Sequence, residues 1–165
     1  MNHIQINQND LIQILCDEAN WESHGIHPRK GLLLYGMTGV GKTYALNAYL
    51  KETLKNMGHQ IDAEVIEIGV AQHGANYFGR FLQDNMVWND FGQEERVMMY
   101  MGTTIKPGQS IFMYRHTKFP TLLTHFTTNR TLDGLEERYG DRIFSRLAEM
   151  CTFINVTGVD RRKNP

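Results

Sequence analysis

The segment GLLLYGMTGVGKT, residues 31–43, constrains the fold of this chain more than any other part of its sequence. Its first six residues form an almost unbroken apolar run between glycines, which is typical of a β-strand covered on both faces. The turn that follows fits the pattern G-x-x-x-x-G-K-[ST]. After the turn, apolar residues recur at helical spacing until Gly58, namely Leu46, Tyr49, Leu50, Leu54 and Met57. A strand, a glycine-rich turn and a helix in this order predict an α/β fold.

The glycine-rich turn predicts a site for phosphate groups. Its glycines allow the backbone to turn tightly, so that N–H groups and the helix N-terminus point at an anion. Lys42 would then neutralise the β- and γ-phosphate oxygens of a nucleotide, and the Thr43 hydroxyl would bind Mg²⁺. The alternative is a chance glycine-rich turn, which would match the fixed positions in about one chain of this length in a hundred or fewer. We therefore expect ATP and Mg²⁺, bound by Gly36, Met37, Thr38, Gly39, Val40, Gly41, Lys42, Thr43 and Tyr44.

Four later segments predict the rest of a sheet. They are rich in β-branched and aromatic residues, and they are 63–70 (AEVIEIGV), 85–89 (NMVWN), 120–128 (PTLLTHFTT) and 151–158 (CTFINVTG). Helical stretches lie between most of them, and this alternation implies a parallel sheet with helices on both faces. Together with residues 31–36 they predict a three-layer α/β fold with a parallel sheet of five strands.

The length of the chain suits one domain. Its 165 residues, 41% of them hydrophobic, are enough for a single hydrophobic core. Residues 10–21 show helical spacing, and the stretch that follows breaks it. We therefore expect an N-terminal helix and linker at 1–30, a core domain at 31–162 and a tail at 163–165.

The composition argues against several classes of protein. The formal net charge of -1 gives no overall attraction to nucleic acid, so any contact with DNA would need a local patch. Cys16 and Cys151 lie far apart and have no metal-ligand spacing, which argues against a disulfide framework or a zinc site and favours two buried small side chains. No apolar run approaches the ~18 residues of a membrane span, and the N-terminus does not resemble a signal peptide. We expect a cytoplasmic protein that does not contact a membrane.

Two polar residues are expected to complete the phosphate site. Asp90 follows the third predicted strand and Asn129 follows the fourth, and the carboxyl ends of parallel strands meet at one edge of a sheet. A neutral amide such as that of Asn129 can bind a γ-phosphate or orient an attacking water without repelling it. The alternative for Asn129 is a helix N-cap before RTLDGLEERYG.

Four motifs together resemble one family. GLLLYGMTGVGKT, VWNDFG, PTLLTHFTTNR and YGDRIFSRL occur in the order and approximate spacing of AAA+ ATPases of the DnaC/IstB type, over roughly residues 28–162. This group contains replicative-helicase loaders of bacteria and phages and ATP-binding helper proteins of transposition. The resemblance implies strand order 5-1-4-3-2 in a P-loop NTPase domain, ATP hydrolysis assisted by Mg²⁺, and a role in DNA replication. It also implies a replicative helicase or a transposase as partner, with single-stranded DNA as a further candidate. We expect no C-terminal helical lid domain of the kind found in other AAA+ proteins.

The resemblance also implies roles for single residues. Residues 36–43 resemble the Walker A loop, and Asn129 resembles the sensor-1 residue. Arg146 resembles the arginine finger, which reaches the ATP of a neighbouring subunit in a homo-oligomer, and Arg142 is the next candidate one helical turn earlier. The alternative is a solvated basic face, in which Arg138, Arg142 and Arg146 pair with Glu136, Glu137 and Glu149.

Asn89 departs from the family pattern. The two acids of the Walker B motif fall on Asn89 and Asp90, so an amide replaces the carboxylate on the metal side. Asn89 can accept a hydrogen bond from a water on Mg²⁺, but it brings no charge. The expected metal-binding residues are Thr43, Asn89 and Asp90, and the expected catalytic residues are Asp90, Asn129, Arg146 and Arg142. ATP hydrolysis should therefore be slow, and the alternative is a protein in which ATP acts only as a structural ligand that gates binding.

Several other features have simpler explanations. Glu94 and Glu95 are expected in the next helix, and Met98, Met99 and Met101 in the core. Two basic clusters could contact single-stranded DNA, with Tyr77, Phe78 and Phe81 either stacking on its bases or filling the core. These clusters are Arg115, His116 and Lys118, and Arg161, Arg162 and Lys163. A nucleoside or small-molecule kinase is a further alternative, but no arginine-rich lid is evident.

Overall fold

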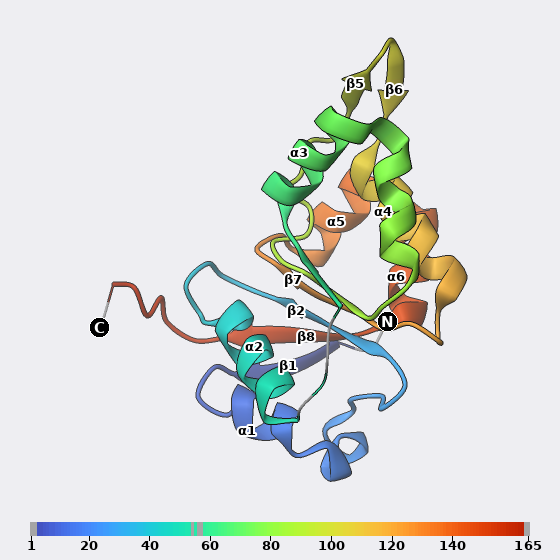
Figure 1. Ribbon diagram of the computed structural model, residues 1–165. Helices are drawn as coiled ribbons and strands as arrows, with labels where there is room; N and C mark the ends of the chain where they lie inside the picture. The colour runs from blue at the N-terminus through green and yellow to red at the C-terminus, as the bar shows by residue number, and fades with distance from the viewer. Residues whose placement is uncertain (1–2, 54, 56–57, 164–165) are drawn as a thin grey trace.

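The computed structural model describes residues 3–53, 55 and 58–163, and a six-stranded parallel sheet forms its centre (Figure 1). The strands lie in the order β1-β8-β2-β7-β4-β3, and each neighbouring pair is parallel. Their bounds are β1 His3–Asn7, β2 Gly31–Tyr35, β3 His59–Ile61, β4 Met86–Trp88, β7 Thr124–Thr128 and β8 Cys151–Thr157. The fold is thus the expected three-layer α/β class.

Helices cover both faces of this sheet (Figure 1). One face carries α1 and α2, and the other carries α3 to α6. The bounds are α1 Leu11–Cys16, α2 Lys42–Glu52, α3 Ala63–His73, α4 Pro107–Lys118, α5 Leu132–Tyr139 and α6 Asp141–Met150. Short 3₁₀ segments lie at Glu18–Asn20, Glu22–His24 and Gly74–Leu82. Leu54 and Met57, which were expected on α2, and residues 164–165 of the expected tail lie outside the described residues.

The alternation of side chains along β2 explains why both faces are covered. Leu32 and Leu34 pack with α1 and α2, whereas Leu33 packs on the other face with α4 to α6. All three are fully buried, and each such burial stabilises the fold by roughly 1.5–3 kcal/mol. The glycine-rich turn therefore starts from the rigid centre of the molecule.

The predicted strand at residues 63–70 is wrong, because this segment forms α3. The side chain of Asp62 accepts a hydrogen bond from the Val65 N–H (2.9 Å) and caps the helix, and Ile66 and Val70 are buried at helical spacing. The strand lies just before it, at β3. With β3 as the second strand, the predicted order 5-1-4-3-2 is observed as β8-β2-β7-β4-β3.

A sixth strand, β1, was not predicted. It lies within the segment assigned to an N-terminal helix and linker, and it pairs with β8 from His3 opposite Phe153 to Asn7 opposite Thr157. The predicted helix at 10–21 is shorter, with α1 followed by a 3₁₀ turn. Cys151 is buried as expected, Cys16 is partly exposed, and both are free thiols.

The region between β4 and α4 also differs from the prediction. Glu94 and Glu95 lie in a loop and not in a helix, and an antiparallel hairpin follows, formed by β5 (Met98–Tyr100) and β6 (Thr103–Ile105). The hairpin projects beyond α3 and α4 (Figure 1). Met99 and Met101 are 64% and 88% exposed, so the expectation that they fill the core is wrong. Met99 lies on β5 and Met101 in the hairpin turn, and the exposed hairpin places both in solvent.

Arg115 does not belong to an exposed basic cluster. It is fully buried on α4, and its guanidinium donates hydrogen bonds to the carbonyl groups of Phe81, Asp84 and Leu123. Burial lowers the pKa of Arg115 to about 10. The aromatic side chains of Tyr77, Phe78 and Phe81 are buried beside it, so they fill the core and do not offer a stacking surface. No helix within the described residues is long and apolar enough to cross a membrane.

Candidate functional site

The turn between β2 and α2 has the backbone conformation that only glycine adopts freely. Gly39 and Gly41 have φ angles of 84° and 86°, in the left-handed region. A Cβ atom on Gly39 would also lie 1.9 Å from a carboxylate oxygen of Asp160. Both the backbone conformation and the packing against Asp160 therefore require glycine at position 39, where the sequence motif has it.

Lys42 begins α2 and directs its ammonium group into this turn. Its Nζ donates hydrogen bonds to the carbonyl oxygens of Gly36 (2.8 Å) and Met37 (2.8 Å) and to Oδ1 of Asn129 (2.7 Å). Lys42 is only 5% exposed, and burial lowers its pKa to about 8, while the charge of Asp90 opposes this shift. The ammonium is therefore available to an anion at neutral pH.

Asn129 and Asp90 extend the same network. The amide nitrogen of Asn129 donates to a carboxylate oxygen of Asp90 (3.0 Å), while its oxygen accepts from Lys42. Three side chains from α2, the end of β7 and the end of β4 thus meet at one edge of the sheet. Thr131 caps α5, with its hydroxyl accepting from the Gly134 N–H (3.1 Å), so the alternative of Asn129 as the helix cap is wrong.

Asn89 directly follows β4 and precedes Asp90 in the chain, and its N–H donates to the Ile61 carbonyl (2.8 Å). It is 8% exposed, and its Oδ1 is buried without a hydrogen-bond partner among the described residues. The Thr43 hydroxyl, at the start of α2, lies 3.3 Å from that of Thr127. A hydroxyl, a free amide oxygen and the Asp90 carboxylate are oxygen donors that suit a hydrated Mg²⁺, so these residues fit the expected ion.

The segment after β8 lies against the glycine-rich turn, a position that the sequence motifs did not predict. The Arg161 N–H donates to the Gly39 carbonyl (3.1 Å), and its guanidinium reaches the Gln8 carbonyl (3.3 Å). The charge of Arg162 contributes to the lowered pKa of Lys42. Both residues belong to the second basic cluster, for which contact with single-stranded DNA and ordinary exposed charge were equal alternatives. The sequence did hold a signal for the position of Arg161 and Arg162. They follow β8, and the carboxyl end of β8 must lie at the same edge of the sheet as those of the other parallel strands.

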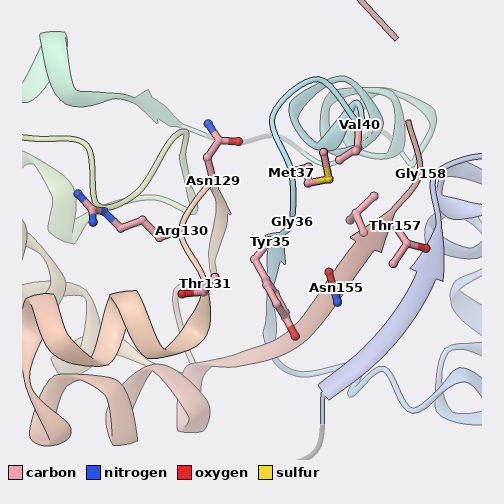
Figure 2. Close-up of a pocket in the computed structure, with 11 residues that line it drawn as sticks. Tyr35, Gly36, Met37, Val40, Asn129, Arg130, Thr131, Asn155, Thr157 and Gly158 are labelled. Atoms are coloured by element: carbon pink, nitrogen blue, oxygen red, sulfur yellow. The ribbon is translucent and has the colours of Figure 1, made fainter. Parts of the chain in front are cut away.

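A pocket of about 400 Å³ opens beside the network (Figure 2). Met37 and Val40 line it from the turn, Asn129 lines it from β7, and Tyr35 and Asn155 line its floor. The pocket is thus bounded by the glycine-rich turn on one side and by Asn129 on the other.

The arginines of α6 do not join this site within the chain. Nη1 of Arg146 lies 2.8 Å from the sulfur of Met113 on α4, and Arg142 is exposed. The alternative of a solvated basic face fails for Arg138, which donates to the Glu94 carbonyl. Glu149 pairs with His116 (3.0 Å) and not with an arginine. Among the contacts of the described residues, neither Arg142 nor Arg146 reaches Lys42, so a role for them in catalysis needs a second subunit.

Comparisons with known proteins identify the fold. No family model and no curated protein matches the sequence. The structure is similar to AMPPCP-bound DnaA from Aquifex aeolicus, with a TM-score of 0.57 and 17% identity over 90% of this chain and 47% of that one. It is also similar to the replication initiator DnaA bound to AMPPCP and single-stranded DNA, with a TM-score of 0.59 and 16% identity over 92% of this chain and 45% of that one. A DNA replication initiation factor gives a TM-score of 0.58 and 17% identity over 81% of this chain and 41% of that one. The fold is therefore similar to that of these replication initiators, and the chain spans less than half the length of these neighbours.

Proposed function

We propose that this chain is an AAA+ ATPase that binds ATP with Mg²⁺ at residues 36–44, hydrolyses it slowly and assists DNA replication. The observation that carries the proposal is the network from Lys42 through Asn129 to Asp90. It joins a cation for phosphate, an amide for the γ-phosphate and a carboxylate for the attacking water within hydrogen-bond distance.

The proposed reaction gives a role to each residue of the site. The Lys42 ammonium exchanges its contacts with the Gly36 and Met37 carbonyl groups for phosphate oxygens. Asn129 orients the γ-phosphate, and Asp90 accepts a hydrogen bond from the attacking water. Thr43, Asn89 and Asp90 would hold Mg²⁺, which neutralises phosphate charge when bound.

Asn89 is the reason to expect slow turnover. An amide oxygen can accept a hydrogen bond from a metal-bound water as a carboxylate does, but without its negative charge. Asp90 then has to serve both the metal and the water, because it is the one carboxylate in the Lys42–Asn129–Asp90 network.

Assembly would complete the site. We propose Arg146 as the finger that acts on the ATP of a neighbouring copy, with Arg142 as the second candidate. A guanidinium spreads its charge over the developing phosphate oxygens, which suits either residue to this task. Arg146 would have to leave its contact with Met113, whereas Arg142 is already exposed.

The wider role is proposed from two kinds of likeness. The sequence motifs resemble helicase loaders of the DnaC/IstB type, and the fold resembles replication initiators, one of which is bound to single-stranded DNA. We therefore propose a replicative helicase as partner and single-stranded DNA as a ligand, in the cytoplasm of a bacterium or of a phage host. A transposase is the alternative partner. A second function, a nucleotide-gated adaptor without turnover, is favoured by the uncharged Asn89.

The test is ATP hydrolysis by the purified chain over a series of protein concentrations, with and without single-stranded DNA. We expect turnover to rise steeply with concentration and to fall by at least about tenfold in Arg146→Ala. Brisk hydrolysis by a monomer contradicts the proposal. ATP binding without turnover at every concentration, in the wild type and in Asn89→Asp, supports the adaptor.

A further inference from the structure

The loop after β4 carries Asp90 in a conformation that its surroundings must hold. Asp90 has a φ of 51°, and Gly92 has a φ of 93°. A residue with a Cβ atom rarely adopts the left-handed region, and it stays there only where contacts fix the backbone. The contacts of this loop therefore determine where the Asp90 carboxylate points.

Strand β7 holds the first half of the loop. The Asp90 N–H donates to the Thr127 hydroxyl (3.1 Å), and the Phe91 N–H donates to the Thr127 carbonyl (2.8 Å). The Thr128 hydroxyl donates to the Phe91 carbonyl (2.7 Å). These bonds tie the loop to the strand that ends at Asn129.

Glu94 holds the second half. Its side chain is fully enclosed, with the residue only 2% exposed, and one carboxylate oxygen accepts a hydrogen bond from the Gly92 N–H (3.0 Å). The other oxygen accepts from the Tyr139 hydroxyl and lies 3.6 Å from the Arg138 guanidinium. A buried carboxylate is costly unless it is paired in this way, so the three partners must stay together.

The same partners form the end of α5. The Tyr139 ring stacks on Phe91 with a centroid distance of 4.7 Å and an angle of 6°. Gly108 on α4 closes the remaining side, because a Cβ atom there would lie 2.2 Å from Glu94 Oε1. Glu94 is therefore enclosed between α4 and the end of α5, and its contacts link the loop to that end of the helix.

Helix α6 starts two residues after Tyr139 and packs against α5. It carries Arg142 and Arg146. The chain of contacts thus runs from Asp90 through Gly92 and Glu94 to Tyr139 and α6.

We propose that Glu94 is a positioning residue that fixes the Asp90 loop to the α5–α6 helix pair, so that nucleotide at the phosphate site and the arginines of α6 are coupled. This inference rests on the proposed nucleotide site. Glu94 touches no reacting atom and acts through the backbone of Gly92 and through Tyr139. In an assembly, the coupling would report the nucleotide state of one subunit to the arginines that it offers to the next.

The test measures both ends of the coupling by NMR. Backbone amide shifts of Lys42 and Arg146 are recorded on the full chain before and after addition of Mg·AMPPCP. In the wild type we expect both amides to shift. In Glu94→Ala the Lys42 shift should persist while the Arg146 shift falls to less than about half, and kcat for ATP should fall about tenfold with KM within about twofold.

Three variants separate positioning from a merely structural role. Glu94→Gln should restore most of the Arg146 shift, because its amide can accept from Gly92 and donate to the Tyr139 oxygen. Tyr139→Phe keeps the stacked ring but loses the hydroxyl that donates to Glu94, so it should reduce the Arg146 shift. This variant tests the coupling if Glu94→Ala does not fold. Glu137→Ala is the matched control, because Glu137 is exposed on the same helix, and it should match the wild type.

Two results from the variants overturn the coupling. They are an Arg146 shift that stays at its wild-type size in Glu94→Ala and in Tyr139→Phe, or a Glu94→Gln variant no better than Glu94→Ala. A wild-type Lys42 amide that moves while Arg146 does not also overturns the coupling alone. A wild-type Lys42 amide that does not move overturns the nucleotide site and the coupling with it.

Discussion

Lys42 and His125 are two buried basic side chains on the same face of the sheet, and their surroundings give them opposite charge states. Lys42 lies at the carboxyl edge, where three oxygens accept its hydrogen bonds, and its pKa is lowered to about 8. His125 lies in the middle of β7, and its Nδ1 accepts a hydrogen bond from the Leu32 N–H (3.1 Å). Burial, with a smaller effect of Lys55, lowers the pKa of His125 to about 4.

The difference shows that burial can leave one basic side chain charged and another neutral, depending on the groups around it. Burial opposes charge on both groups. The charge of Asp90 opposes that effect on Lys42, which stays cationic below about pH 8, whereas His125 must stay neutral because its lone pair binds a backbone N–H. The edge of the sheet thus holds a positive charge on Lys42 that can bind an anion, whereas the buried His125 on β7 carries no charge.

The largest expected effect is the pH dependence of the free energy of unfolding that the neutral His125 causes. In the unfolded chain His125 gains its proton near pH 6.5, and in the folded protein it gains it near pH 4. The unfolded chain binds more protons between these values, so lowering the pH from 6.5 to 4 should reduce the free energy of unfolding by about 3 kcal/mol. Urea denaturation across this range measures it. His125→Asn should flatten the dependence, exposed His24→Asn should not, and equal slopes in all three proteins would refute the assignment.

The next effect is the contribution of the charged Lys42 to ATP affinity. Lys42→Ala should weaken ATP binding by about 2 kcal/mol, or about thirtyfold, because it removes charge-assisted hydrogen bonds to phosphate. Titration calorimetry measures the affinity. Lys51→Ala, an exposed lysine on the same helix, is the control and should bind as the wild type does. Equal affinities in the two variants would show that Lys42 does not bind phosphate.

A smaller effect follows from the pKa of Lys42. Phosphate oxygens favour the ammonium form, so the nucleotide complex holds its proton at a pH where the free protein loses it. ATP affinity should therefore be constant below about pH 8 and fall by up to about tenfold per pH unit above it. Calorimetry at pH 9 in buffers of different ionisation enthalpy should show proton uptake on binding, and none in Lys42→Ala. Proton release would reverse the assignment.

The sequence predicted the parts of the fold whose signals are local. The glycine-rich turn, β2 and the start of α2 follow from one continuous motif. Lys42, Asp90 and Asn129 could be brought together because parallel strands end at one edge. Their roles in binding and catalysis remain proposals.

Other parts depend on partners far away in the sequence. The strand β1 pairs with β8, about 150 residues later, and nothing local distinguishes it from a linker. The α3 segment has a strand-like composition, but its cap at Asp62 and its packing make it a helix. Glu94 and Arg115 look like surface charges until Tyr139 and the Phe81 carbonyl are placed beside them.

The most direct test of the account is a Mg²⁺ titration of ATP hydrolysis by the wild type and by Asn89→Asp at the same protein concentration. A restored carboxylate should lower the Mg²⁺ concentration at half-maximal rate by about fivefold and raise the maximal rate, because it adds a charged oxygen on the metal side. That result would show that Asn89 limits an otherwise complete site. Rapid hydrolysis by the wild type, with no change in Asn89→Asp, would contradict the account.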